Sequence, residues 1–194
     1  MAGHFEALPG GGAAVALDEV EISILRSLAV QLMELIGPGD EPVEGEDPLA
    51  ALFAEGPSEP PSDPALKRLF PDAYGDEDEE LRAAAADFRR YTENDLRARK
   101  REDALAVVRN LDALTSSGEG GAILKLTADE SRAWLGALND LRLTIGTRLE
   151  VTEEDESEAL YRLPDSDPRK PMVMAYLWLG ALQESLVETL MPGA

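Results

Sequence analysis

The sequence predicts a mainly α protein, a helical bundle with a small N-terminal β-hairpin that a third strand near residues 122–126 can join. Three observations lead to this prediction. Four long segments carry apolar residues at helical spacing, capping residues stand at segment starts, and Pro and Gly cluster between segments. With 194 residues, 44% of them hydrophobic, the chain is long enough for one domain with a sizeable core.

The N-terminal part of the sequence predicts a hairpin followed by a helix. Two short extended runs flank Pro9-Gly10-Gly11-Gly12, and this arrangement predicts a hairpin. Asp18 then predicts a helix start, because Glu21 three residues later completes a capping box. Apolar residues follow at helical spacing until Gly37-Pro38-Gly39 ends the helix.

We expect a single domain that spans 1–194, interrupted by an acidic, proline-rich and partly mobile insertion at about 37–76. Within it we expect short helical turns at Leu49–Ala54 and Ala65–Phe70, because a proline precedes each and proline favours the first turn of a helix.

The chain is strongly helical from Glu77 to about Leu114, with a break into two helices possible at Thr92–Asn94. One side of this segment is apolar, and we expect it to be buried. Its members are Leu81, Ala84, Ala85, Phe88, Tyr91, Leu96, Leu105, Val108, Leu111 and Leu114.

Two further helices complete the predicted bundle. After the strand at 122–126, Thr127 and Glu130 form a second capping box, which predicts a helix to about Leu149. The last helix, 171–190, is apolar on nearly all sides in its first half. Such a helix lies either at the centre of a core or in a homodimer interface, and the sequence leaves both open.

Charge and composition exclude several classes of function. The formal net charge of −21 excludes a generally basic nucleic-acid binder. The chain contains no cysteine and one histidine, His4, so zinc fingers, disulfide frameworks, cysteine nucleophiles and most histidine-based triads are excluded. We expect no cofactor and no metal. Because no apolar run is long enough for a membrane span and no signal peptide is evident, we expect a cytoplasmic protein without membrane contact.

A local basic stripe stands out against this acidic background. Residues 82–109 carry eight Arg or Lys against five acids. Four of the arginines are our candidates for binding a protein partner: Arg89, Arg90, Arg97 and Arg101. The alternative is that they pair with acidic loops or with Glu93, Asp95 and Glu102. We do not expect direct nucleic-acid binding, since the field of the whole molecule repels polyanions.

A second candidate is a cluster of polar residues within the apolar helix after Thr127. Its members are Asn139, Asp140, Arg142 and Arg148. Two interpretations remain open: a buried polar network that fixes the register of the helix, or a pocket. An enzyme with a carboxylate and arginine cleft would use the same residues.

Several motifs together resemble an actinobacterial domain-of-unknown-function family of AosR-type oxidation-sensing regulators, encoded beside the ClpS adaptor gene. The motifs are Asp63–Tyr74, Asp87–Arg97 and Trp134–Leu143, with Phe5-Glu6 and Pro9–Gly12 at the start and Trp178-Leu179 and Gln183–Leu186 at the end. The resemblance implies action with a stress sigma factor on cysteine biosynthesis genes, through a Cys-x-x-x-Cys switch. This chain has no cysteine, so it cannot sense an oxidant by forming a disulfide.

Taken together, these observations predict a non-catalytic regulatory module that binds another protein, a sigma factor or RNA polymerase, and acts on transcription. The first alternative is an accessory protein of ClpS- or Clp-linked proteolysis, which only the gene neighbourhood of the resembling family suggests. The second is an uncharacterised enzyme.

Overall fold

The computed structural model describes residues 3–37, 56–75, 77–114, 121–151 and 162–191. The elements in chain order are β1 (Glu6–Ala7), β2 (Ala13–Asp18), α1 (Glu19–Ile36), α3 (Pro64–Leu69), α4 (Glu79–Asp112), β3 (Gly121–Leu126), α5 (Ala128–Arg148) and α7 (Lys170–Leu190). The protein is therefore mainly α, with a small antiparallel sheet, as the sequence predicted. None of the helices in the described ranges combines the length and the apolar character that crossing a membrane requires.

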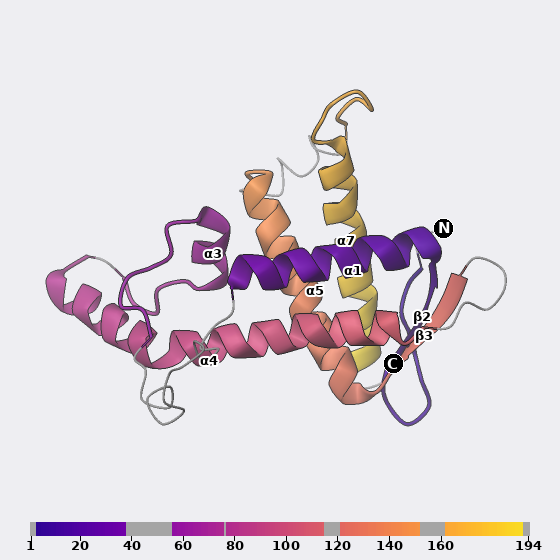
Figure 1. Cartoon of the computed structure of the whole chain (residues 1–194), viewed down its shortest axis with the longest axis horizontal. Coiled ribbons are helices and arrows are strands. Elements are labelled where there is room, and N and C mark those ends of the chain that lie inside the picture. Colours follow the sequence, from indigo (N-terminus) through magenta and orange to yellow (C-terminus); the bar gives the residue numbers. More distant parts are fainter. Residues whose placement is uncertain (1–2, 38–55, 76, 115–120, 152–161, 192–194) are drawn as a thin grey trace, which may run out of the picture.

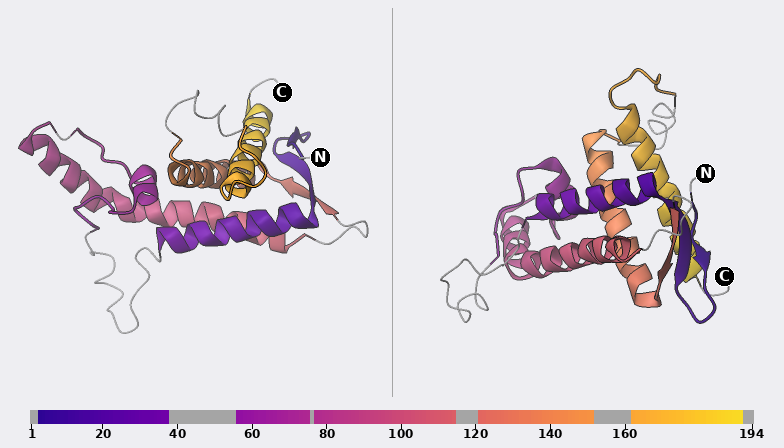
Figure 2. Two further views of the ribbon diagram at one scale, coloured as in Figure 1. Left: turned by 90° about the horizontal axis from the view of Figure 1, so that it is seen from above. Right: turned by 45° about the vertical axis from the view of Figure 1, so that its right-hand side comes forward.

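The long helices form two crossed layers (Figure 1). α1 and α4 run side by side in opposite directions, and α5 and α7 run across them as a second antiparallel pair, seen nearly end-on in the left view of Figure 2. The sheet lies at one end of the α1–α4 layer and α3 lies toward the other. The largest fully buried side chains between the layers include Leu25, Leu32, Val107, Trp134, Leu138 and Leu182.

The sheet has the strand order β1-β2-β3, and both pairings are antiparallel. The predicted hairpin and the third strand are thus both confirmed. Alternation along β2 buries Val15 and Leu17 against the helices and exposes Ala16. Gly12 has φ +99°, and a Cβ there would lie 2.2 Å from the carbonyl oxygen of Leu126, so the turn requires a glycine at this position.

The predicted helix starts are also confirmed. Asp18 and Glu21 form a capping box on α1, and Thr127 and Glu130 form one on α5. The turn predicted at Ala65–Phe70 is present as α3, which begins and ends one residue earlier, at Pro64 and Leu69. The turn predicted at Leu49–Ala54 lies outside the described residues.

Two predictions about α4 are wrong. The helix continues through Thr92–Asn94 without a break, and the Thr92 hydroxyl donates a hydrogen bond to the Phe88 carbonyl within the helix, 2.8 Å away. The expected apolar side is also not buried along its whole length, since Phe88, Tyr91 and Leu96 are exposed.

The last helix belongs to the core. Val173, Leu179, Leu182 and Leu186 of α7 are completely buried within a single chain, which confirms the core location that the sequence left open. The apolar character of α7 is thus explained without a second copy, while a homodimer through this helix stays a prediction.

Candidate protein-binding surface on helix α4

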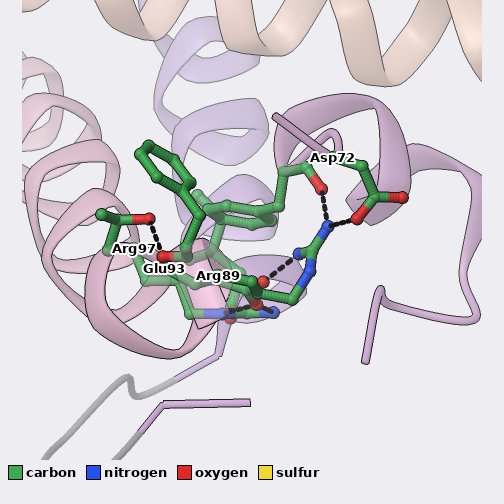
Figure 3. A network of polar contacts seen from close by, with 8 residues as sticks. Asp72, Arg89, Glu93 and Arg97 are labelled. Carbon is green, nitrogen blue, oxygen red and sulfur yellow. Dashed lines mark hydrogen bonds and ion pairs between the residues drawn. The ribbon is translucent and has the colours of Figure 1, made fainter. Parts of the chain in front are cut away.

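A ladder of charged side chains follows the buried side of α4. Arg89, Glu93 and Arg97 lie one turn apart, and Glu93 is only 3% exposed. Its carboxylate accepts hydrogen bonds from Arg89 and from Arg97, with Arg97 Nε 2.9 Å and Nη2 2.7 Å from the same oxygen (Figure 3). One buried carboxylate therefore balances two guanidinium groups.

Arg89 also fixes the loop that follows α3. Its Nη2 donates to the Phe70 carbonyl at 3.0 Å and to Asp72 Oδ1 at 2.8 Å. Burial opposes the charged form of Arg89, but the hydrogen bonds and charges of Asp72 and Glu93 outweigh burial and raise its pKa. The guanidinium of Arg97 lies over the Phe70 ring, 4.3 Å from the centroid. The ladder thus joins α4 to the chain after α3.

Arg97 and Arg101, the C-terminal members of the four candidate arginines, cap the C-terminal end of α1. Arg97 Nη1 donates to the Ile36 carbonyl at 2.5 Å, and Arg101 Nη1 donates to the carbonyls of Met33 at 3.1 Å and Gly37 at 2.6 Å. The last carbonyls of a helix have no partner within the helix, and its C-terminal end attracts cations. α1 has no basic residue in its own last turn, so α4 supplies the positive charge.

These contacts revise the predicted partner site. For Arg89 and Arg97 the alternative is confirmed, because both pair with Glu93. Arg89 is 4% exposed and cannot contact a partner in this conformation. Arg90 is part-exposed, with Asp87 3.8 Å away, and a partner-binding role for it stays a prediction, as it does for Arg97 and Arg101.

The surface that α4 does present is aromatic. Tyr91 is 69% exposed, Phe88 48%, Tyr74 47% and Leu96 38%. The rings of Tyr74 and Phe88 meet edge to face, with centroids 6.2 Å apart. We call Tyr74, Phe88 and Tyr91 the aromatic patch, since Tyr91 lies one helical turn from Phe88 on α4. Tyr74 lies in the segment before α4, whereas Phe88 and Tyr91 lie on the N-terminal half of α4, which projects beyond the rest of the bundle (Figure 1).

Sequence reasoning missed this patch because helical spacing made its members look buried. In the N-terminal half of α4 the charged side, with Arg89 and Glu93, is the buried one, whereas the C-terminal half buries apolar residues such as Val107 and Leu111. The available signal was the spacing Arg89-x-x-x-Glu93-x-x-x-Arg97, which places alternating charges on one side of a helix.

The four polar residues of α5 do not meet in one place. Lys100 Nζ of α4 donates to Asp140 Oδ1 at 2.6 Å, and Arg142 donates to Gln183 of α7 at 2.6 Å. Asn139 also accepts from Gln183, at 3.4 Å, and Arg148 donates to Asp63 at the start of α3, at 2.7 Å.

Each residue therefore ties α5 to a neighbour, which favours the interpretation as register-fixing contacts over a shared pocket. Burial raises the pKa of the Asp140 carboxyl, against the opposing effect of Lys100. The cleft that the enzyme alternative needs is not formed by these four side chains.

Comparison with known proteins gives the family. A family model described as a domain of unknown function (DUF2017) matches residues 2–190. Proteins named oxidative stress regulator AosR from Mycobacterium bovis and Mycobacterium tuberculosis are each 30% identical over 88% of this chain and 78% of their own length. A Mycobacterium leprae relative with the AosR designation is 31% identical over 88% of this chain and 79% of its own. No solved structure matches the chain. The chain therefore belongs to the DUF2017 family and is similar to the AosR oxidative stress regulators.

Proposed function

We propose that this chain is a non-catalytic regulatory module that binds a sigma factor or RNA polymerase and acts on transcription. The aromatic patch carries the proposal. Tyr74 and Phe88 are exposed and in ring contact, and the exposed Tyr91 lies one turn from Phe88. Exposed Tyr and Phe side chains are enriched at the centres of protein interfaces, where such residues supply most of the binding energy. The names of the relatives support a regulatory role.

The ladder beneath the patch supports the same proposal. Arg89 holds Asp72 and the Phe70 carbonyl, and these residues precede Tyr74 in the chain. The patch is thus built on a rigid base, and a preorganised surface loses less conformational entropy when a partner binds.

Charge favours a protein partner over DNA. The net charge of −21 repels a polyanion, and several basic side chains of the stripe are engaged inside the molecule. The sequence has no cysteine, so the proposed contact does not depend on an internal disulfide.

The test is a binding titration of the purified chain against sigma factors and core RNA polymerase from the same organism, after nuclease treatment. The double variant Phe88→Ala with Tyr91→Ala should weaken binding by roughly a hundredfold, since interface aromatics commonly contribute about 2 kcal/mol or more. The matched control is Val20→Ala with Ile123→Ala. It removes two equally exposed apolar side chains elsewhere, at 65% and 61%, and should leave binding unchanged.

Flat titrations against every sigma factor and the polymerase would contradict the proposal. Equal binding by wild type and the patch variant would remove the patch as the site. Binding to ClpS or a Clp ATPase instead would favour the proteolytic alternative.

A further inference from the structure

A second surface lies on α7, away from the aromatic patch. A groove of about 730 Å³ runs along one side of the C-terminal half of this helix and is bounded by Arg142 and by residues of α7. Its α7 lining recurs at helical spacing and includes Leu177, Ala181, Glu184, Val187, Glu188 and Met191. This side faces away from the completely buried Leu179, Leu182 and Leu186.

The groove combines an apolar floor with negative charge. Leu177, Val187 and Met191 are apolar, and Met191 is 60% exposed. Glu184 and Glu188 are exposed carboxylates one turn apart on the same lining. The cation among the described lining residues, Arg142, is already engaged: it donates to Gln183 and lies over the Tyr176 ring, 5.3 Å from the centroid.

Glu184 and Glu188 occupy positions that are electrostatically unfavourable within α7. Like charges four residues apart on a helix repel each other. The last turn of α7 contains no basic residue, and a carboxylate near a helix C-terminus opposes the helix dipole. At the end of α1 the same problem is solved by Arg97 and Arg101 of α4. The last turn of α7 has no corresponding arginine contact among the hydrogen bonds of the described residues.

We propose that the α7 groove binds a basic amphipathic helix of a partner protein. Lysine and arginine side chains of the partner complement Glu184, Glu188 and the negative end of α7, while its apolar side packs on Leu177, Val187 and Met191. From residue 177 to residue 191 the lining extends about 21 Å at 1.5 Å per residue, which matches four turns of helix. This inference goes beyond the proposed function, because it concerns a second contact that does not require the aromatic patch.

The test is fluorescence anisotropy with the full chain and three labelled peptides of about 18 residues, about five turns of helix. The first has a leucine side and a lysine side, the second replaces lysine by glutamate, and the third replaces leucine by serine. Only the first should bind. A bound glutamate peptide, or equal binding of the serine peptide, would overturn the proposal.

The decisive comparison uses two variants with the same change in net charge. Glu184→Gln with Glu188→Gln should weaken binding of the leucine–lysine peptide roughly tenfold. Glu19→Gln with Glu34→Gln, on the exposed side of α1, should change it by no more than about twofold. Equal weakening by both variants would mean that the peptide responds only to total charge, and would overturn the groove as the site.

Two further measurements separate binding from folding and from self-association. Because the groove variant removes a repelling pair, its thermal midpoint should equal or exceed that of the wild type, and a lower midpoint would show that the glutamates serve the fold instead. Val187→Ser should weaken binding of the leucine–lysine peptide without unfolding the chain. A dimer in sedimentation experiments that dissociates in the Val187→Ser variant would assign the groove to a second copy and overturn the proposal. The aromatic-patch variant should bind the peptide normally, so this test is independent of the proposed function.

Discussion

The charge balance on the buried side of α4 depends on a single side chain, Glu93. It is the carboxylate between Arg89 and Arg97, and all three charges lie on the buried side of α4. Bringing charges out of water is costly, and the cost is recovered only if every charge has a partner. Arg89 meets this condition with Asp72 and a carbonyl, and Arg97 meets it with the end of α1.

Replacing Glu93 by Gln should therefore lower the free energy of unfolding by about 3–5 kcal/mol, because two arginines lose their shared counter-charge. Urea unfolding measures the change. The control is Glu102→Gln, which breaks an exposed pair with Arg109 at 2.9 Å and should cost less than about 1 kcal/mol. Equal losses in the two variants would mean that Glu93 is not structurally special.

Asp63 makes a pH-dependent contribution at the start of α3. It accepts hydrogen bonds from the backbone N–H groups of Ala65 and Leu66 and from Arg148. The hydrogen bond from Arg148 is the main reason that its pKa lies below the ordinary value, and the backbone N–H groups add to the effect against the opposing influence of burial.

The unfolded chain, with an ordinary pKa at this position, takes up the proton first as the pH falls. The stabilisation by Asp63 is thus complete above about pH 4 and is lost as the pH falls through the lowered pKa. Asp63→Asn should flatten the dependence of the unfolding free energy on pH below about pH 4. Denaturant titrations at several pH values check this, and an unchanged slope would contradict it.

At the level of secondary-structure elements, one row of charged residues on α4 contacts two other parts of the fold. Arg89, nearer the N-terminus of α4, binds the chain after α3, and Arg97 and Arg101, further along the helix, neutralise the C-terminal end of α1. The row was visible in the sequence as a basic stripe, but its targets were not. They lie far away in the chain, since Ile36 and Arg97 are 61 positions apart and Gly37 and Arg101 are 64 positions apart.

Arg101→Gln should loosen the last turn of α1 without unfolding the bundle. The carbonyls of Met33 and Gly37 lose a charged donor, so hydrogen exchange of the amides at 33–37 should accelerate while the amides of α5 keep their protection. Arg109→Gln, at an exposed position near the end of α4, is the matched control. Acceleration spread evenly over all helices would contradict a capping role.

At the scale of the whole molecule, the net charge of −21 opposes the compact state. Most local ion pairs at the surface, such as that of Arg26 with Asp112, are half exposed and contribute little. Long-range repulsion between acids is therefore the electrostatic effect that salt should relieve.

Raising the ionic strength from 0.01 M to 0.15 M shortens the screening length from about 30 Å to about 8 Å. The thermal midpoint should rise over this range, since repulsion between distant acids is screened more than the buried pairs around Glu93. Thermal melts at constant pH measure it. A falling midpoint would show that exposed ion pairs, not repulsion, dominate the electrostatics of the fold.

Most of the fold could be predicted because its signals are local. Asp18 with Glu21, Thr127 with Glu130, and Pro64 act within four residues, and each marks the start of a helix in the structure. The candidate site was only partly predictable. The arginines were recognised as unusual, but Phe88 and Tyr91 were assigned to the core. The polar residues of α5 were grouped as one cluster, although only Asn139 and Arg142 share a neighbour, Gln183.

Local sequence patterns specify the helices and the three strands, because capping and periodicity are properties of neighbouring residues. Composition alone gives the net negative charge and the lack of a cysteine switch. Tertiary packing selected which side of the N-terminal half of α4 is buried. Both sides had the right spacing, and the choice depended on α1 and the chain after α3, which supply carbonyls and Asp72 to the arginines. Once those charges were satisfied inside, the aromatic side of α4 was left to the solvent, and there it forms the candidate binding surface.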